Sequence, residues 1–156
     1  MVEYRDYNFA GKTMEFFVTH QTVEHYSGDC AVAFVFKDKT HKNKDLQQLL
    51  ELNRFEAIVG ATLMLSQVSG YKTKRLLVVG LGDSSLNEKN YIKVLHSLSS
   101  ALSDARVKNV VIPDIQIDNR DESWMQLTTA RVLKNASYQV EKVDAKEENE
   151  KGSLEA

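Results

Sequence analysis

The chain lacks several features that mark specialised classes of protein. It has one cysteine, Cys30, among 156 residues, so no disulfide can form within it. No apolar run approaches the roughly 20 residues that cross a bilayer, and the first seven residues are too polar for the apolar stretch of a signal peptide. These absences predict a protein of the cytoplasm with no membrane partner.

A strong charge of one sign is also missing. The 20 Lys and Arg residues are balanced by 22 Asp and Glu residues, which gives a formal net charge of -2. A dedicated nucleic-acid-binding protein needs a strong basic field, so only a local basic patch remains as a candidate contact for DNA. The 42% hydrophobic and 27% charged content is close to the globular average. Length and composition together predict one globular domain.

Short apolar runs, separated by helical patterns, predict the strands. Three runs are apolar on both faces and too short for helices, as buried strands between two helical layers would be: Cys30–Phe36, Arg75–Gly80 and Asn109–Ile112. The weaker candidates are Met14–Val18, Ala61–Leu65 and an edge strand at Tyr138–Val143.

Three segments between these runs have helical patterns. Lys44–Leu52 places Leu46, Leu49 and Leu50 on one side. Ser85–Glu88 matches a capping box, and the helix behind it should run from about Glu88 to Asp104. Its apolar face comprises Tyr91, Leu95, Leu98 and Leu102.

An acidic start at Asn119–Glu122 opens the last predicted helix, ahead of Trp124, Leu127, Val132 and Leu133. Strands that alternate with helices predict an α/β fold with three layers, α/β/α, and a mixed, largely parallel sheet. We expect an N-terminal extension over residues 1–13, the folded domain over 14–143 and a polar linker or tail over 144–156.

The strongest candidate ligand site is the turn Gly80-Leu81-Gly82 with the following Asp83. It lies between a buried strand and a helix, where α/β proteins offer backbone N–H groups to phosphates. A dinucleotide fingerprint would have a third glycine at the position of Ser85. The sequence therefore favours a plain tight turn, with a ligand-binding turn as the alternative.

The remaining motifs favour structural roles. Gly11-Lys12-Thr13 lacks the earlier glycine of a phosphate loop, and a strand pattern follows it. Cys30 opens a buried strand, as an inert core thiol would. The four histidines, His20, His25, His41 and His96, lack metal-ligand spacing. Asp83 and Asp114 each follow a strand end, where both catalytic groups and ordinary turn residues occur.

The only local basic cluster is the stretch from Lys37 to Lys44, with Lys37, Lys39, Lys42 and Lys44 as its cations. These side chains are candidates for phosphate contacts of nucleic acid. A solvated loop before a helix explains them equally simply. No complete catalytic constellation emerges, so we predict neither catalytic nor metal-binding residues in this chain.

The order of the segments resembles the N-terminal domain of the leucyl aminopeptidases, the cytosolic M17 metallopeptidases. The resemblance rests on Cys30–Phe36, Ala61–Leu65, the K-R-L-L-V-V-G-L-G run of Lys74–Gly82 with the helix behind it, and Ala130–Tyr138. It covers roughly residues 14 to 144.

The resemblance implies a macrodomain-like fold and a parent enzyme that removes N-terminal residues, leucine among them, with two divalent metals, manganese or zinc. In that family the catalytic residues belong to a C-terminal domain with the signature N-T-D-A-E-G-R-L, which this chain lacks. The chain would then be a non-catalytic accessory domain, with its own catalytic domain and a hexamer as partners. Binding of an ADP-ribose-type nucleotide at Gly80–Asp83 and binding of DNA are the alternatives that the family and fold suggest.

Overall fold

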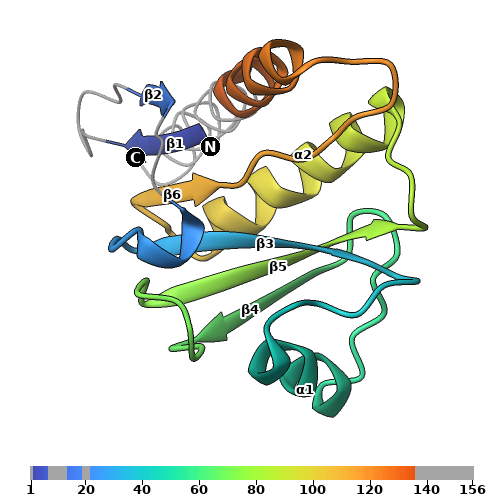
Figure 1. Cartoon of the computed structure of the whole chain (residues 1–156). Coiled ribbons are helices and arrows are strands. Elements are labelled where there is room, and N and C mark those ends of the chain that lie inside the picture. The colour runs from blue at the N-terminus through green and yellow to red at the C-terminus, as the bar shows by residue number, and fades with distance from the viewer. Residues whose placement is uncertain (1, 7–13, 19–21, 136–156) are drawn as a thin grey trace, which may run out of the picture.

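The computed structural model describes residues 2–6, 14–18 and 22–135. Its strands form one mixed sheet in the order β2-β1-β6-β3-β5-β4 (Figure 1). The strands are β1 (Val2–Asp6), β2 (Met14–Val18), β3 (Cys30–Phe36), β4 (Thr62–Ser66), β5 (Arg75–Gly82) and β6 (Asn109–Ile112). Parallel pairing is confined to the central strands β6, β3 and β5, while β1, β2 and β4 pair antiparallel at the two sides.

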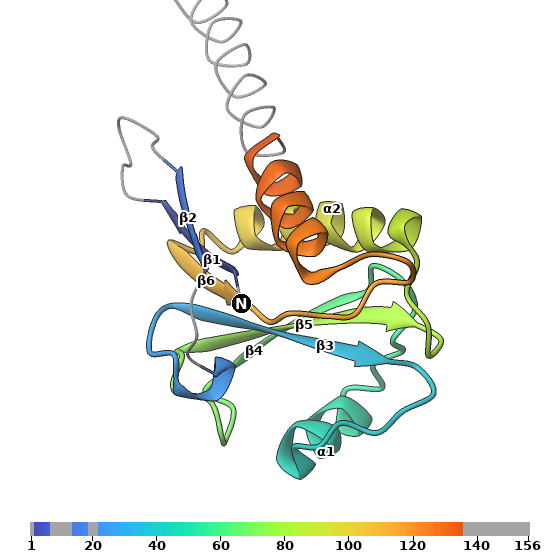
Figure 2. The same cartoon turned by 45° about the horizontal axis from the view of Figure 1, so that its top comes forward.

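Helices cover both faces of this sheet (Figure 2). The short helix α1 (Lys44–Leu52) lies on one face, with the 3-10 turn η1 (Val23–His25) in the segment before β3. The long helix α2 (Glu88–Asp104) and a helix over residues 122–135 lie on the other face. The predicted three-layer α/β/α class with a mixed sheet is confirmed, although "largely parallel" describes only its centre.

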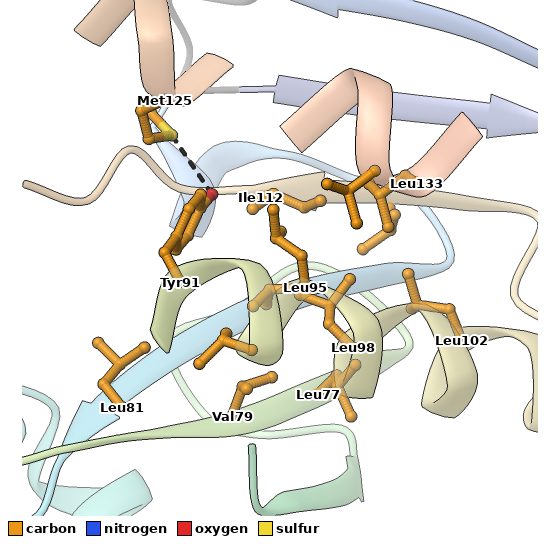
Figure 3. Close-up of a cluster of buried hydrophobic side chains, with 14 of the residues drawn as sticks. Leu77, Val79, Leu81, Tyr91, Leu95, Leu98, Leu102, Ile112, Met125 and Leu133 are labelled. Atoms are coloured by element: carbon orange, nitrogen blue, oxygen red, sulfur yellow. Dashed lines mark hydrogen bonds between the residues drawn. The ribbon is translucent and has the colours of Figure 1, made fainter. Parts of the chain in front are cut away.

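The central strands serve two hydrophobic cores at once. In β5, Leu77 and Val79 face α2, whereas Leu76 and Val78 face α1. Successive side chains of a strand point to opposite faces, so a strand buried on both sides must be apolar throughout. In the core between the sheet and α2, the helix contributes its predicted apolar face of Tyr91, Leu95, Leu98 and Leu102, and all four residues are buried (Figure 3).

The N-cap of α2 lies two residues after the one that the capping box predicts. Asn87, not Ser85, is the N-cap of α2, and its side-chain oxygen accepts from the Asn90 N–H at 2.8 Å. Asn43 caps α1 in the same way. The prediction for Ser85 was wrong because Leu86 is buried in the core, which leaves Asn87 as the last extended residue before the helix.

The helix over residues 122–135 begins after Asp121, whose carboxylate accepts from the Trp124 N–H at 2.8 Å. Its buried apolar side chains are Met125, Val132 and Leu133. Of the four apolar residues predicted for this helix, Val132 and Leu133 are buried and Trp124 is partly buried, but Leu127 is 73% exposed.

Strand β1 is an element that the sequence pattern did not predict. Val2–Asp6 lies between β2 and β6 in the sheet, within the segment that we expected to be an extension before the domain. Its mixed polar sequence has no apolar run that would mark a strand. The predicted edge strand Tyr138–Val143 and the Gly11-Lys12-Thr13 motif lie outside the described residues.

Among the glycines compared in the described part of the chain, Gly80 is the one at which a Cβ atom would lie nearest to neighbouring backbone. A Cβ atom at this position would overlap the Ile58 carbonyl oxygen and lie 2.7 Å from the Ala57 carbonyl carbon. The segment before β4 therefore packs directly on the backbone of β5, which only glycine permits.

We expect Gly80→Ala to lower the free energy of unfolding by about 1–3 kcal/mol, because the added methyl group meets backbone that cannot rotate away. Urea unfolding measures the change. Asp83→Ala, at an exposed position just after β5, is the control and should stay within about 0.5 kcal/mol of the unsubstituted protein. Equal losses for both variants would contradict the packing argument.

Candidate functional site

The glycines of the predicted ligand-binding turn lie inside strand β5. The Gly80 N–H donates to the Ala61 carbonyl and the Gly82 N–H to the Ala57 carbonyl, each at 2.8 Å. Gly82 has a φ of 79°, in the left-handed region that favours glycine, and lies where the β3–β5 register shifts. These glycines therefore join β5 to neighbouring segments.

The hydrogen bonds matter for the phosphate hypothesis. A helix-turn phosphate site needs free N–H donors, and two of the candidate donors are engaged within the protein. A phosphate beside this turn would also meet the carboxylate of Asp83, which is exposed. A ligand site at Gly80, Leu81, Gly82 and Asp83 stays a prediction.

The four cations of the basic cluster, Lys37, Lys39, Lys42 and Lys44, are all exposed around the loop between β3 and α1. The Lys42 ammonium is paired with the Glu24 carboxylate at 3.3 Å, and the Lys39 ammonium lies 4.8 Å from the centre of the Phe36 ring. These local contacts compete with nucleic acid for two of the charges. DNA binding through this loop stays a prediction.

The other candidates do not assemble into a reactive site. Cys30 is fully buried, and burial raises the pKa of its thiol to about 12, so the nucleophilic thiolate is suppressed. Asp83 and Asp114 are exposed, and Asp114 accepts from the Gln126 amide at 3.3 Å. Across residues 2–6, 14–18 and 22–135, no three His, Cys, Asp or Glu residues are grouped to hold a metal ion.

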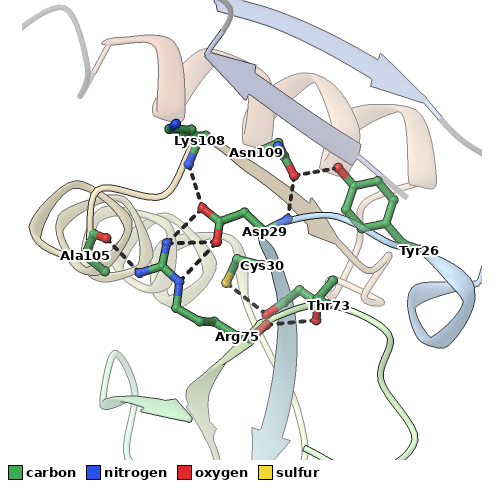
Figure 4. A network of polar contacts seen from close by, with 9 residues as sticks. Tyr26, Asp29, Cys30, Thr73, Arg75, Ala105, Lys108 and Asn109 are labelled. Atoms are coloured by element: carbon green, nitrogen blue, oxygen red, sulfur yellow. Dashed lines mark hydrogen bonds and ion pairs between the residues drawn. The ribbon is translucent and has the colours of Figure 1, made fainter. Parts of the chain in front are cut away.

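A dense polar network lies at the starts of the parallel strands, the end opposite to the Gly80–Asp83 turn (Figure 4). The Asp29 carboxylate, just before β3, accepts from the guanidinium of Arg75, the first residue of β5, at 2.8, 3.0 and 3.2 Å. It also accepts from the Lys108 backbone N–H at 3.0 Å, just before β6. One side chain thus holds the starts of three neighbouring strands.

The network also includes the carboxyl end of α2. Arg75 donates to the carbonyl of Ala105, the C-cap of that helix, at 2.7 Å. A cation at this position opposes the negative end of the helix dipole. The Asn109 side chain extends the network by accepting from the Asp29 N–H and the Tyr26 hydroxyl. Sequence reasoning did not predict this network. Its signal in the sequence is a charged residue at the start of each of two buried strands, Asp29 before β3 and Arg75 in β5.

The pKa of Asp29 is set by opposing influences. Burial, the largest single influence, raises the pKa of this carboxyl group, but the hydrogen bonds from Arg75 and Lys108 and the positive charges of Arg75 and Lys74 together outweigh it and hold the pKa below the ordinary value of 3.8. The charged form is therefore the one that the folded protein stabilises.

His41 is a second polar residue with a positional role. Its Nδ1 atom accepts from the Asn43 N–H at 3.0 Å, and Asn43 in turn caps α1 by accepting from the Leu46 N–H at 3.1 Å. Only neutral imidazole can accept this bond. Burial and the charge of Lys42 lower the pKa of His41, against a smaller opposing influence of Glu24.

The model of the N-terminal domain of the cytosol aminopeptidase family matches residues 31–147. The chain belongs to the cytosol aminopeptidase family. A probable cytosol aminopeptidase of Vesicomyosocius okutanii is 35% identical over 130 residues, and one of Nitrosomonas europaea is 26% identical over 155. These matches cover 83% and 90% of this chain but 27% and 31% of the relatives, so the chain spans under a third of their length.

Solved structures place this aminopeptidase domain in the macrodomain fold. The macrodomain of Mycobacterium tuberculosis DarG matches with a TM-score of 0.60 and 12% identity, covering 78% of this chain and 89% of that one. A mutant of tomato leucine aminopeptidase matches with a TM-score of 0.52 and 20% identity, covering 76% of this chain and 27% of that one. The resemblance drawn from the sequence and the macrodomain-like fold are both confirmed.

No helix in residues 2–6, 14–18 and 22–135 of the aminopeptidase domain is both long and apolar enough to cross a membrane. This finding concerns the described helices alone.

We expect Asp29→Asn to lower the free energy of unfolding by about 1–3 kcal/mol at pH 7, because it removes a charged acceptor of several hydrogen bonds. The stabilisation by Asp29 is present above the unfolded pKa and is lost as the pH falls through the lowered folded pKa. Urea unfolding at pH 7 and at about pH 2 tests both statements. Asp118→Asn, at an exposed site, is the control. If the difference in free energy of unfolding between Asp29→Asn and the unsubstituted protein persisted at about pH 2, the stabilising role of the Asp29 carboxylate would be contradicted.

Protonation of His41 should weaken the start of α1. The pKa of His41 in the folded protein lies below the ordinary value of 6.5. The stabilisation that neutral His41 gives to the folded protein is therefore complete above about pH 6.5 and is lost as the pH falls through the folded pKa. His41→Asn should remove this fall, of about 0.5–1.5 kcal/mol, because an Asn oxygen accepts the same N–H without titrating. Thermal unfolding between about pH 4 and 8 measures it. His96→Asn, exposed on α2, is the control and should keep the slope; an unchanged slope in His41→Asn would refute the role.

Proposed function

We propose that the chain is the non-catalytic N-terminal accessory domain of a cytoplasmic leucyl aminopeptidase. The observation that carries this proposal is the match of residues 31–147 to the N-terminal domain of the cytosol aminopeptidase family. The relatives that share it are much longer and are called aminopeptidases, so peptide hydrolysis belongs to the whole protein. In this proposal the chain packs on a catalytic domain of the same protein.

The chemistry of the described residues supports a division of roles between this chain and a catalytic domain. Peptide hydrolysis in the whole enzyme would use two divalent metal ions, manganese or zinc, to activate water and polarise the peptide carbonyl. The described residues have no grouped ligands for such ions, and the buried thiol of Cys30 is held protonated. We therefore assign the metals to the catalytic domain.

The accessory role that we propose is structural and regulatory. The sheet is covered on both faces, and its strand starts are held together by Asp29 and Arg75, which makes the domain a preorganised unit for assembly. In the whole enzyme it would pack on the catalytic domain of a hexamer. Nucleotide binding at Gly80–Asp83 and DNA binding through the basic loop are alternatives that no contact in the structure favours.

A domain exchange tests the proposal. We expect the purified chain to release no leucine from leucine p-nitroanilide with added Mn²⁺ or Zn²⁺. The aminopeptidase of Vesicomyosocius okutanii should lose assembly and at least about tenfold of its activity when its N-terminal domain is deleted. Insertion of this chain in its place should restore both. The physical reason is that, in this proposal, the N-terminal domain supports the active enzyme by packing on its catalytic domain and contributes no catalytic residue.

The matched control is the same exchange with Gly80→Ala, which lowers the stability of the inserted domain without touching its surface. It should restore assembly at low temperature and lose it at a lower temperature than the unsubstituted insert. Metal-dependent release of leucine by the purified chain, retained through an independent preparation, would overturn the proposal. So would a folded exchange protein that fails to assemble.

A further inference from the structure

Strand β4 (Thr62–Ser66) is an unprotected edge of the sheet. It is the last strand beside β5, and no described strand lies beyond it (Figure 1). Natural edge strands are usually protected by charges, prolines or bulges. The sequence of β4, TLMLS, has no charged residue and no proline, and its pairing with β5 runs without a register shift. At the other edge, β2 contains Glu15.

The hydrogen bonds at both ends of β4 show which backbone groups point outward. The Gly80 N–H donates to Ala61, and the Gln67 N–H donates to Lys74. Paired residues of an antiparallel ladder alternate between bonded and non-bonded, so Leu63 and Leu65 bond toward β5. The N–H and C=O groups of Thr62, Met64 and Ser66 therefore point away from the sheet.

The apolar side chains of β4 are only partly covered at this open edge. Leu63, Met64 and Leu65 are half-buried, while Thr62 and Ser66 are exposed. Leu63 and Leu65 pack against the core beneath α1, and Met64 packs against the core beneath α2. A further strand alongside β4 would cover the open sides of all three apolar residues.

We propose that β4 pairs antiparallel with β4 of a second copy of this chain, about a two-fold axis at Met64. In this register Met64 faces the partner's Met64, and Thr62 faces the partner's Ser66. Each of the three outward residues then donates and accepts once, so every outward group of both strands is paired. Shifting the register by two residues leaves outward groups of both strands unpaired.

The occupant is a second copy because the outward backbone groups of this edge pair fully with those of an identical strand, and the strand carries no charge that would repel its copy. Two uncharged strands meet without repulsion, and Leu63 lies beside the partner's Leu65 on the same face. Two sheets joined in this way form one continuous sheet, in which both hydrophobic layers run across the two-fold axis. The inference is independent of the proposed aminopeptidase role.

The register makes the test specific. Thr62→Lys combined with Ser66→Lys places lysine opposite lysine twice, whereas Thr62→Lys combined with Ser66→Glu places lysine opposite glutamate twice. Both positions are exposed, so neither variant disturbs the core. Sedimentation equilibrium of the full chain, at about 50 mM salt and up to about 1 mM protein, gives the dimer dissociation constant, and circular dichroism melting confirms the fold.

We expect the unsubstituted chain, 17.7 kDa as a monomer, to associate to a dimer with a dissociation constant on the order of 100 μM or tighter. The lysine–lysine variant should bind roughly tenfold more weakly, and the lysine–glutamate variant should match or exceed the unsubstituted chain. A chain that stays monomeric at about 1 mM overturns the proposal. So does a dimer on which the two variants act alike, because it forms through another surface or register.

Discussion

Burial of the central strands on both faces is the constraint on which this domain depends. Leu76 and Val78 serve one core of the domain, while Leu77 and Val79 serve the other. A slip of one residue in β5 would exchange the two sets and mismatch both helical layers. The strand therefore needs its register held at both ends. Arg75 does so at one end through Asp29, and Gly80 does so at the other through its contact with Ala57.

The same constraint explains why two backbone N–H groups of the predicted ligand-binding turn are engaged within the protein. In open α/β sheets, ligands bind beyond the carboxyl ends of the parallel strands. Here the segment before β4 crosses that end of β5 and accepts the N–H groups of Gly80 and Gly82. The polar residues with the most contacts lie at the opposite end, where they stabilise strand starts.

Much of the fold could be predicted because its signals are local. The runs at β3 and β6 and the periodicity of α1 and α2 predict those elements at their observed bounds. Buried strands must be apolar and surface helices must be amphipathic, so both leave patterns in the sequence. Strand β1 leaves no such pattern, because it owes its place to pairing with β6. The N-cap of α2 was misassigned by two residues, since burial of Leu86 decides where that helix can begin.

By itself, the sequence determined the α/β class, the central strands, the family resemblance and the absence of the family's catalytic signature. Each of these depends on residues close together in the chain. Only the tertiary structure decided that Asp29 meets Arg75, that Gly80 lies against Ala57 and that β4 is left at an open edge. Those relations join segments far apart in sequence. They depend on which strand lies beside which, and hydrophobic periodicity carries no record of strand order.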